Sequence, residues 1–214
     1  MKYTKFWVPV ALALSLAACG STTPDTDTDA ARRDAVTKRP FEPMLDGKWV
    51  GNGISYGAYR DGEAPGEVRT SKEHILEDLR ILAPRWNLIR LYGADEQARN
   101  ILEVIEEHDL PVRVMQGIWL DAHKSEQEND EQVRLAIEYA NRFSDIIIAV
   151  NVGNEIFVDW SYHRIDDIDG VIEKIRQVRE SIDQPVTVAD DYNFWNKPQA
   201  RRVADELDFI CLHA

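Results

Sequence analysis

From residue 49 to residue 214, the sequence predicts an α/β fold, specifically a TIM (β/α)8 barrel of which this chain holds about six of the eight βα units. Three observations predict it. Short apolar runs alternate with amphipathic helical stretches, as in a parallel sheet covered by helices. Polar and aromatic residues follow nearly every apolar run, as at the mouth of a barrel. The stretch is also shorter than the about 250 residues of a complete barrel.

Six short apolar runs are expected to form the strands of the sheet. Helical stretches alternate with these runs, so consecutive strands are expected to run parallel. The last run contains Cys211, which we expect to be a small buried apolar residue. The six runs are 53–56, 87–92, 112–118, 146–151, 186–189 and 208–212.

The helical stretches carry apolar residues at a period of 3.6, which predicts that each stretch buries one face in the core. Ser71 and Asp95 precede the first two stretches. Asn129 is expected to cap the third, with Gln132 placed for a capping box. The stripes of the third and fourth stretches are Val133, Ala136, Ile137, Ala140 and Phe143, and then Ile168, Val171, Ile172, Ile175, Val178 and Ile182.

The loops favour a barrel over a doubly wound nucleotide-binding sheet. Such a sheet needs a glycine-rich phosphate turn after its first strand. Here Gly51 and Gly53 lie before and within the first expected strand instead. Trp49 and Trp86 do not follow strands and are expected to pack in the core or the barrel floor.

The N-terminal part is interpreted as a secretory signal followed by a tether. Residues 1–18 have a basic start, an apolar stretch and the small residues that signal peptidases require. Residues 16–20 resemble the lipobox of bacterial lipoproteins, so we expect Cys19 to be lipidated and to anchor the protein to the cell envelope. The alternative is an ordinary signal peptide with a chance cysteine. Residues 19–48 are rich in polar residues and are expected to form a disordered tether before the domain at 49–214.

Charge and composition exclude some classes of partner. The net charge is −13, which argues against nucleic acid. The five histidines show no ligand spacing, so we expect no metal and no organic cofactor. With Cys19 lipidated, Cys211 is left alone and no intrachain disulfide is expected.

The strongest chemical signal follows the fourth expected strand, in the sequence Gly153-Asn154-Glu155. A carboxyl group at the end of a buried strand, followed by apolar residues, is expected to be partly removed from water, which favours its protonated form. Such a group suits a general acid. Asn154 can donate to a sugar hydroxyl, and aromatic rings at the rim can stack on a pyranose. The pattern predicts a glycosidase site around Glu155.

Several blocks in this order resemble glycoside hydrolase family 17, a β-1,3-glucanase family of a large clan of retaining barrel enzymes. The resemblance covers residues 49–214 and depends on the ordered combination of the blocks. The blocks are 53–57 (Gly-Ile-Ser-Tyr-Gly), 89–95 (Ile-Arg-Leu-Tyr-Gly-Ala-Asp), 152–155 (Val-Gly-Asn-Glu), 188–192 (Val-Ala-Asp-Asp-Tyr) and 208–213 (Asp-Phe-Ile-Cys-Leu-His).

The resemblance implies a retaining hydrolase of laminarin-like β-1,3-glucan, with Glu155 as general acid/base and Asn154 binding the sugar 2-hydroxyl. Retention requires a second carboxylate about 5 Å away. In the family this nucleophile is a glutamate after strand seven, so we expect it beyond Ala214 and expect this chain alone to be inactive. Asp190 and Asp191 are the rim carboxylates that could replace it. The other residues implied to bind substrate are Tyr56, Arg90, Tyr92, Tyr192, Asp191, Trp119 and His213.

Two alternatives remain open. A β-1,3-glucan transglycosylase (glucanosyltransferase) would use the same residues and would differ in whether water or a sugar reaches the intermediate. A non-catalytic glucan-binding lipoprotein would keep the barrel without the nucleophile. In each case the expected partners are a β-glucan oligo- or polysaccharide and, through Cys19, the membrane, and the protein is expected to be a monomer.

Overall fold

The computed structural model describes residues 36–64 and 70–214 of the chain. The chain divides into two units, Met1–Ala35 and Val36–Ala214, and only residues of the second are described. The expected signal peptide, Cys19 and the first part of the expected tether therefore lie outside the described residues. Among the residues that are described, no helix is long and apolar enough to cross a membrane.

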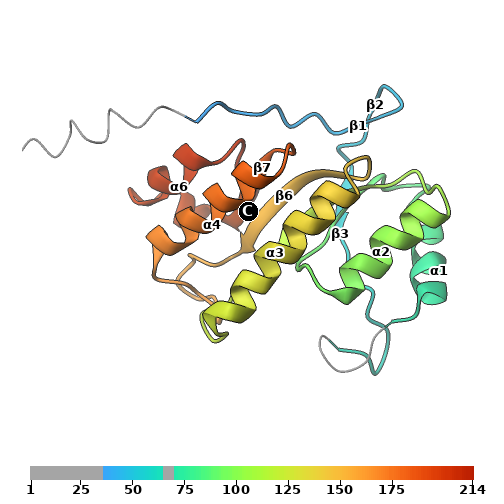
Figure 1. Cartoon of the computed structure of the whole chain (residues 1–214), viewed down its shortest axis with the longest axis horizontal. Helices are drawn as coiled ribbons and strands as arrows, with labels where there is room; N and C mark the ends of the chain where they lie inside the picture. Colours follow the sequence, from blue (N-terminus) through green and yellow to red (C-terminus); the bar gives the residue numbers. More distant parts are fainter. Residues whose placement is uncertain (1–35, 65–69) are drawn as a thin grey trace, which may run out of the picture. The chain divides into compact units, whose positions relative to one another are not determined.

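Six parallel strands form one sheet and are joined in their order along the chain. The sheet curls into a half-barrel in which β3 and β8 are the two edges (Figure 1). The α/β fold and the six parallel strands are confirmed, and they are consistent with a TIM-like barrel. The strands are β3 (Gly53–Ser55), β4 (Leu88–Arg90), β5 (Arg113–Ile118), β6 (Ile147–Asn154), β7 (Val186–Asp191) and β8 (Cys211–His213).

Helices follow the strands and pack on one face of the sheet (Figure 1). α3 contacts β5 and β6, and α4 contacts β7. This arrangement leaves the carboxyl ends of the parallel strands at one edge of the sheet, where loops carry the polar residues singled out in the sequence. The helices are α1 (Lys72–Leu82), α2 (Glu96–Glu107), α3 (Glu126–Arg142), α4 (Ile168–Ser181), α5 (Tyr192–Trp195) and α6 (Ala200–Glu206).

Side chains cap the first turns of the long helices. Ser71 and Asp95 accept hydrogen bonds from the first turns of α1 and α2. The third helix begins one turn earlier than predicted, because Ser125 is its N-cap and forms a capping box with Glu128. The prediction that Asn129 caps this helix is therefore wrong. Its side chain is buried and bonds to the backbone of the loop before the helix.

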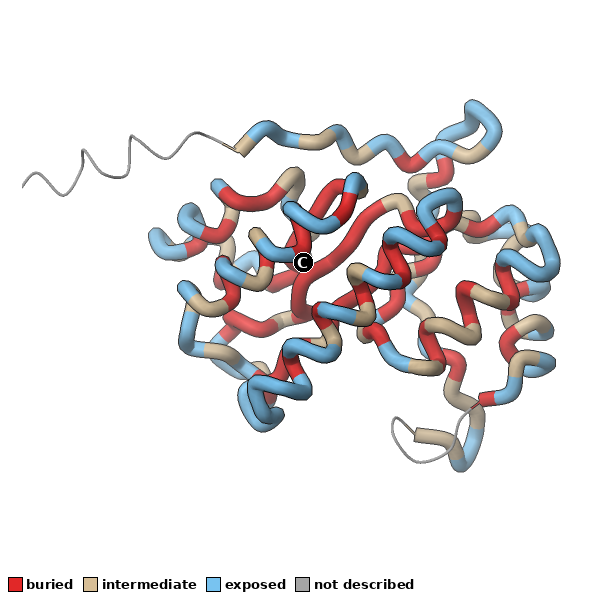
Figure 2. Tube along the Cα trace, viewed as in Figure 1, coloured by how far each residue is buried: buried red, intermediate tan, exposed pale blue. Residues whose placement is uncertain are grey.

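Most of the apolar core lies between the helices and the sheet. Figure 2 shows buried residues along the strands and on the helix sides that face them. The predicted stripes of α3 and α4 are confirmed, with Ile137 and Ile168 only partly buried. Their fully packed members are Val133, Ala136, Ala140 and Phe143, and Val171, Ile172, Ile175, Val178 and Ile182.

A second, smaller apolar cluster lies on the opposite face of the sheet. Leu88 and Met115 belong to it, whereas their neighbours Ile89 and Val114 belong to the main core. Successive side chains of a strand point to opposite faces, so the second cluster lies inside the curl of the sheet. Phe41 packs there although it precedes the sheet by several residues.

The segment before the sheet is held against the domain from Thr37 onward, within the range that the sequence assigns to the tether. The Arg39 guanidinium donates to the carbonyls of Arg179 and Gln184, at 2.7 and 3.0 Å. The Arg39 N–H donates to the Asp208 carboxylate at 2.7 Å. The Phe41 ring stacks on Phe209 with centroids 4.4 Å apart. These contacts fix the segment at the end of the sheet away from Glu155.

Two predictions about burial are corrected in this region. Trp49 ends the short hairpin of β1 (Met44–Leu45) and β2 (Lys48–Trp49) and is 66% exposed rather than packed in the core. Cys211 is half-buried rather than buried. In both cases the residue lies at an edge of the packed layers, where apolar sequence character alone does not determine burial.

Candidate active site at the carboxyl end of the sheet

A strained turn at the end of β6 carries Glu155. The φ angles of Gly153 and Glu155 are 90° and 51°, and a positive φ is uncommon for a residue other than glycine. A Cβ atom at Gly153 would lie 2.5 Å from the Ile156 side chain, so glycine is required there. The Glu155 N–H donates to the Ala189 carbonyl of β7 at 2.8 Å. The turn thus presents Glu155 at the carboxyl end of the sheet.

Three strands bring a hydrogen-bonded chain of four polar side chains together at this end of the sheet. Glu155 Oε1 lies 2.8 Å from His213 Nδ1. His213 Nε2 lies 3.2 Å from one terminal nitrogen of Arg90. The other terminal nitrogen of Arg90 donates to Asn154 Oδ1. Four residues that the sequence places in one site are therefore in direct contact, although they come from β4, β6 and β8.

The hydrogen-bond pattern assigns the proton on His213. A guanidinium only donates, so Arg90 donates to His213 Nε2 and the proton of the neutral imidazole is on Nδ1. Nδ1 then donates to Glu155. The Glu155 side chain is 39% exposed, which is more exposure than the partly dehydrated environment that the sequence predicts. Among the described residues, His213 is the hydrogen-bond partner of this carboxyl group, so one oxygen remains available to a ligand.

Aromatic and acidic residues lie around this chain of contacts. The Arg90 guanidinium lies over the Tyr92 ring, 5.1 Å from its centroid, and Tyr92 is 40% exposed. Asp191 pairs with His213 in the register of β7 and β8, and its carboxylate caps α5. Tyr192, the next residue, is 54% exposed. These residues are placed at the rim, as the sequence predicts.

Trp119 is connected to the site through His163. The two rings lie 4.4 Å apart between centroids, and His163 Nε2 lies 2.6 Å from the Asn154 carbonyl oxygen. The backbone N–H of Trp119 also donates to the side-chain oxygen of Gln132, which holds the start of the loop against α3. Trp119 is therefore linked to the Asn154 backbone through His163 and is not in direct contact with Glu155.

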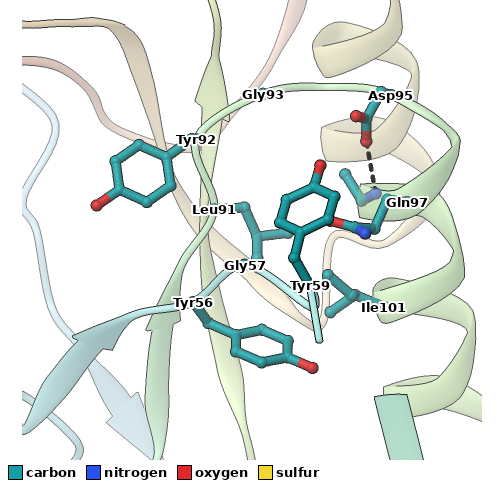
Figure 3. Close-up of a pocket in the computed structure, with 10 residues that line it drawn as sticks. Tyr56, Gly57, Tyr59, Leu91, Tyr92, Gly93, Asp95, Gln97 and Ile101 are labelled. Carbon is teal, nitrogen blue, oxygen red and sulfur yellow. Dashed lines mark hydrogen bonds between the residues drawn. The ribbon is translucent and has the colours of Figure 1, made fainter. Parts of the chain in front are cut away.

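The structure does not bring Tyr56 to the chain of polar contacts. Its hydroxyl donates to Asp78 of α1 at 3.0 Å, and burial followed by the charge of Asp78 raises the pKa of Tyr56. Figure 3 shows Tyr56 and Tyr92 pointing in opposite directions beside a small cavity that Tyr59 also lines. Because β3 is short and the chain then turns toward α1, the ring packs beneath the rim.

Asp190 lies under the turn that carries Glu155. It is fully buried, and its two oxygens accept from the N–H groups of Phe157 and Asp191 at 2.9 and 2.8 Å. The pKa of Asp190 is raised to about 6: burial is the main cause and the charge of Glu155 adds to it, whereas the two N–H groups and His213 oppose the increase. A carboxylate occupied in this way cannot face a substrate, so the expectation that Asp190 could act as the nucleophile does not fit its position in this structure.

Sequence reasoning missed the role of His163. It is 9% exposed and lies against the Asn154 carbonyl, whereas the sequence shows only that the histidines lack metal-ligand spacing. Nothing in its spacing from Glu155 signals the contact, because the loop between β6 and α4 folds back before the histidine is reached. Among the described residues, no group of three or more histidine, cysteine, aspartate or glutamate side chains is arranged to hold a metal ion.

A carboxyl group with one free oxygen, held by a neutral imidazole, can both give and take a proton at a bound ligand. The arginine and amide beside it can bind hydroxyl groups through hydrogen bonds. The exposed tyrosine rings offer faces on which a sugar ring can pack. The arrangement therefore suits acid/base chemistry on a polyhydroxylated ligand.

Comparisons with known proteins identify the family of the domain. A family model described as the BtgE/BtgC glycoside hydrolase domain matches residues 53–214. The glucan endo-1,3-beta-glucosidase btgC of Emericella nidulans is 24% identical over 149 residues, which cover 65% of this chain and 22% of that protein. The chain thus spans about a fifth of the length of the curated relatives it matches.

Solved structures share the fold. The endo-laminarinase from Formosa Hel1_33_131 superposes with a TM-score of 0.65 and 23% identity, over 76% of this chain and 49% of that one. The glycoside hydrolase family 17 beta-1,3-glucanosyltransferase from Rhizomucor miehei superposes with a TM-score of 0.57 and 23% identity, over 76% and 56% of the two chains. Both likenesses establish the half-barrel architecture.

Proposed function

This chain belongs to the BtgE/BtgC glycoside hydrolase domain family. From that premise we propose that it is part of a retaining hydrolase of laminarin-like β-1,3-glucan, in which Glu155 is the general acid/base. The observation that carries the proposal is the contact chain from Glu155 through His213 and Arg90 to Asn154. The curated relative named a glucan endo-1,3-beta-glucosidase supports the choice of substrate.

Glu155 performs two proton transfers in this mechanism. In the first step its carboxyl group protonates the oxygen of the leaving sugar. In the second step the carboxylate accepts a proton from the water that attacks the glycosyl intermediate. His213 supports both steps, because its Nδ1–H can stay hydrogen-bonded to one oxygen of the Glu155 carboxyl group. The second oxygen of that group then exchanges the proton with the ligand.

The neighbouring residues bind and orient the glucan. Asn154 holds the 2-hydroxyl, an interaction that strengthens in the oxocarbenium-like transition state. Arg90 fixes the Asn154 amide so that its N–H group faces the sugar. The exposed Tyr92 and Tyr192 offer ring faces to neighbouring sugar units. Trp119 and Asp191 complete the rim on either side.

The nucleophile belongs, in this proposal, to a glutamate after a seventh strand, beyond Ala214, in a barrel of eight βα units. Retaining enzymes need that carboxylate about 5 Å from the acid/base. The open edges at β3 and β8 support the proposal, because further strands would pair with them. The lengths of the two solved structures, of which this chain covers about half, support it as well.

We place the enzyme at the cell envelope. The sequence 16–20 supports lipidation of Cys19, and the tether that follows would give the domain reach from the membrane. In this arrangement a monomeric enzyme meets glucan outside the cytoplasm.

The test is Glu155→Ala in the full-length protein that carries these residues. The kcat on laminarin is expected to fall by about 10²- to 10⁴-fold, because general acid/base assistance is lost from both steps. With a dinitrophenyl β-glycoside the first step needs little protonation, so the intermediate accumulates and azide, which needs no general base, restores turnover and yields the β-glycosyl azide. Glu138→Ala, on the exposed face of α3, is the matched control.

A Glu155→Ala enzyme with near wild-type kcat on laminarin would remove the acid/base assignment. Products longer than the substrate would indicate a glucanosyltransferase instead of a hydrolase. Laminarin binding by wild type without any turnover would indicate a glucan-binding protein.

A further inference from the structure

The backbone from Asn154 to Phe157 is anchored at four successive points. The Glu155 N–H donates to the Ala189 carbonyl, and the Ile156 carbonyl accepts from the Ile165 N–H at 2.7 Å. These two anchors are backbone groups. The other two are side chains: His163 Nε2 lies 2.6 Å from the Asn154 oxygen, and the Asp190 carboxylate accepts from the Phe157 N–H at 2.9 Å.

Both side-chain anchors are buried and come from different parts of the chain. His163 is 9% exposed and lies on the loop that leads to α4, whereas Asp190 is 0% exposed and lies on β7. A carbonyl only accepts, so the proton on Nε2 of His163 is donated to Asn154. The other ring nitrogen faces the Ser161 hydroxyl at 3.4 Å. The Trp119 ring covers the imidazole and restricts its rotation.

The segment between these anchors is strained, so it is expected to change conformation if an anchor is removed. Glu155 has a positive φ of 51° without being a glycine, and such a conformation persists only where the surroundings hold it. Without an anchor on the Asn154 carbonyl or the Phe157 N–H, the peptide units on either side of Glu155 could rotate toward a relaxed conformation. The carboxyl group would then leave the position at which it meets His213 Nδ1 at 2.8 Å.

We propose that His163 and Asp190 are positioning residues that act as a two-sided clamp on the turn and so aim the Glu155 carboxyl group at the leaving oxygen of the glucan. The proposal rests on the proposed function for its catalytic consequence. Neither residue touches substrate in this scheme. Each acts through one backbone hydrogen bond, on the carbonyl side or the N–H side of Glu155.

The clamp has a consequence that a general structural role does not share. A misplaced acid/base slows glucan hydrolysis, because both proton transfers depend on its position. Turnover of a dinitrophenyl β-glycoside in the presence of azide needs neither transfer. A variant that loosens the turn is therefore slow on glucan and unimpaired with the activated substrate and azide, whereas a variant that damages the fold is impaired in both.

The experiment compares His163→Leu, His163→Gln and Asp190→Asn in the full-length protein, with His74→Leu on the exposed side of α1 as control. His163→Leu removes the donor to Asn154, and its kcat on laminarin is expected to fall by about 10- to 100-fold. His163→Gln keeps an N–H donor at a similar reach, so it should recover most of that loss. Asp190→Asn presents an NH₂ group to one of the two N–H groups and should also be slow. Azide-supported turnover should stay within about twofold of wild type in all three.

Amide hydrogen exchange provides a readout that does not depend on activity. The N–H groups of Glu155 and Phe157 should exchange about tenfold faster or more in His163→Leu than in wild type, because the strained turn opens locally. The N–H groups in the middle of α3 should be unchanged. If wild type shows no laminarin hydrolysis or Glu155→Ala retains it, the proposed function fails, and the exchange data alone then support or reject the clamp.

Two results would overturn the proposal. One is His163→Leu and Asp190→Asn enzymes whose laminarin kcat and whose exchange at Glu155 and Phe157 match wild type. The other is an equal loss of glucan and azide-supported turnover, which would mean that the residues support the fold and do not aim the carboxyl group.

Discussion

Asp190→Asn tests the electrostatics beneath the candidate acid/base. In the wild type, the pKa of the Asp190 carboxyl is raised from an ordinary value of 3.8 to about 6. Burial is the largest cause and the charge of Glu155 adds to it, whereas the N–H groups of Phe157 and Asp191 and the charge of His213 oppose it. Asparagine has the same shape but does not ionise. It also accepts through only one of its two terminal atoms.

The sign and size of the effect follow from linkage. A carboxyl group whose pKa is higher in the folded than in the unfolded state contributes stability that is fully present below the unfolded pKa and is lost as pH rises through the folded pKa. A shift of about two pKa units corresponds to about 3 kcal/mol. The free energy of unfolding of the wild type, measured relative to Asp190→Asn, should therefore fall by about 2 to 2.5 kcal/mol between about pH 4 and about pH 7, which is most of the full change.

The two ends of this range differ in which form is more stable. Near pH 4 the wild-type carboxyl is neutral, and the variant is expected to be less stable by about 1–3 kcal/mol because one backbone N–H loses its acceptor. Near pH 7 the cost of the buried charge offsets that loss, so the two forms should be about equally stable. Urea unfolding at four or five pH values, with the exposed Asp183→Asn as control, measures this difference.

The charges of Glu155 and His213 also act on Asp190, so the series should be repeated in a Glu155→Gln background. There the difference between the two pH limits should be smaller, because the neighbouring negative charge is gone. A difference between wild type and Asp190→Asn that stays constant from pH 4 to pH 7 would refute the assignment of a raised pKa to this carboxyl.

Three further predictions follow from single residues. Gly153→Ala should destabilise the protein by about 2–3 kcal/mol in urea unfolding, because an L residue resists a φ of 90° and its Cβ would meet Ile156 at 2.5 Å; stability equal to wild type would mean that the turn is not constrained. Phe41→Ala should cost about 2 kcal/mol through its lost stacking on Phe209, and an unchanged Tm would show that the segment before the sheet is not part of the folded unit. Cys19→Ala should abolish fatty-acid labelling and detergent partitioning, and continued labelling would exclude Cys19 as the lipidation site.

The repeating part of the fold is predictable because its signals are local. Apolar residues at a period of 3.6 fix which helix face is buried, and the stripes of α3 and α4 are buried as expected. The start of α3 is harder to predict, because Ser125 and Asn129 are both suitable N-cap residues and lie one turn apart. Glu128 decides it by closing the capping box with Ser125, and Asn129 is then free to bond the preceding loop.

Contacts between distant segments are less accessible to sequence reasoning. Lys38 and Arg39 lie in a polar stretch that composition assigns to a tether, yet they donate to carbonyls at the ends of α6 and α4, more than a hundred residues away. Tyr56 follows a strand, as the other rim residues do, but it pairs with Asp78 beneath the rim. The position of a residue relative to a strand end predicts at which end of the sheet the residue lies, but it does not predict the direction in which its side chain points.

In the candidate site, too, the sequence pattern predicts some of the residues, and only the tertiary structure reveals the others. Glu155 and Asn154 were predictable because they end a buried strand, and His213 because it ends another. Asp190 also lies at a strand end, but the sequence does not show that it is buried under the turn, and His163 carries no strand-end signal. The place of each is explained only once the turn is seen to be strained. Near neutral pH the Asp190 charge costs about as much stability as its hydrogen bonds contribute. A residue that adds little net stability near neutral pH and yet anchors the backbone N–H of Phe157, just after the acid/base, is best explained by its effect on the carboxyl group. It follows that Asp190→Asn should separate the two properties near pH 7, leaving the free energy of unfolding about unchanged while glucan hydrolysis slows.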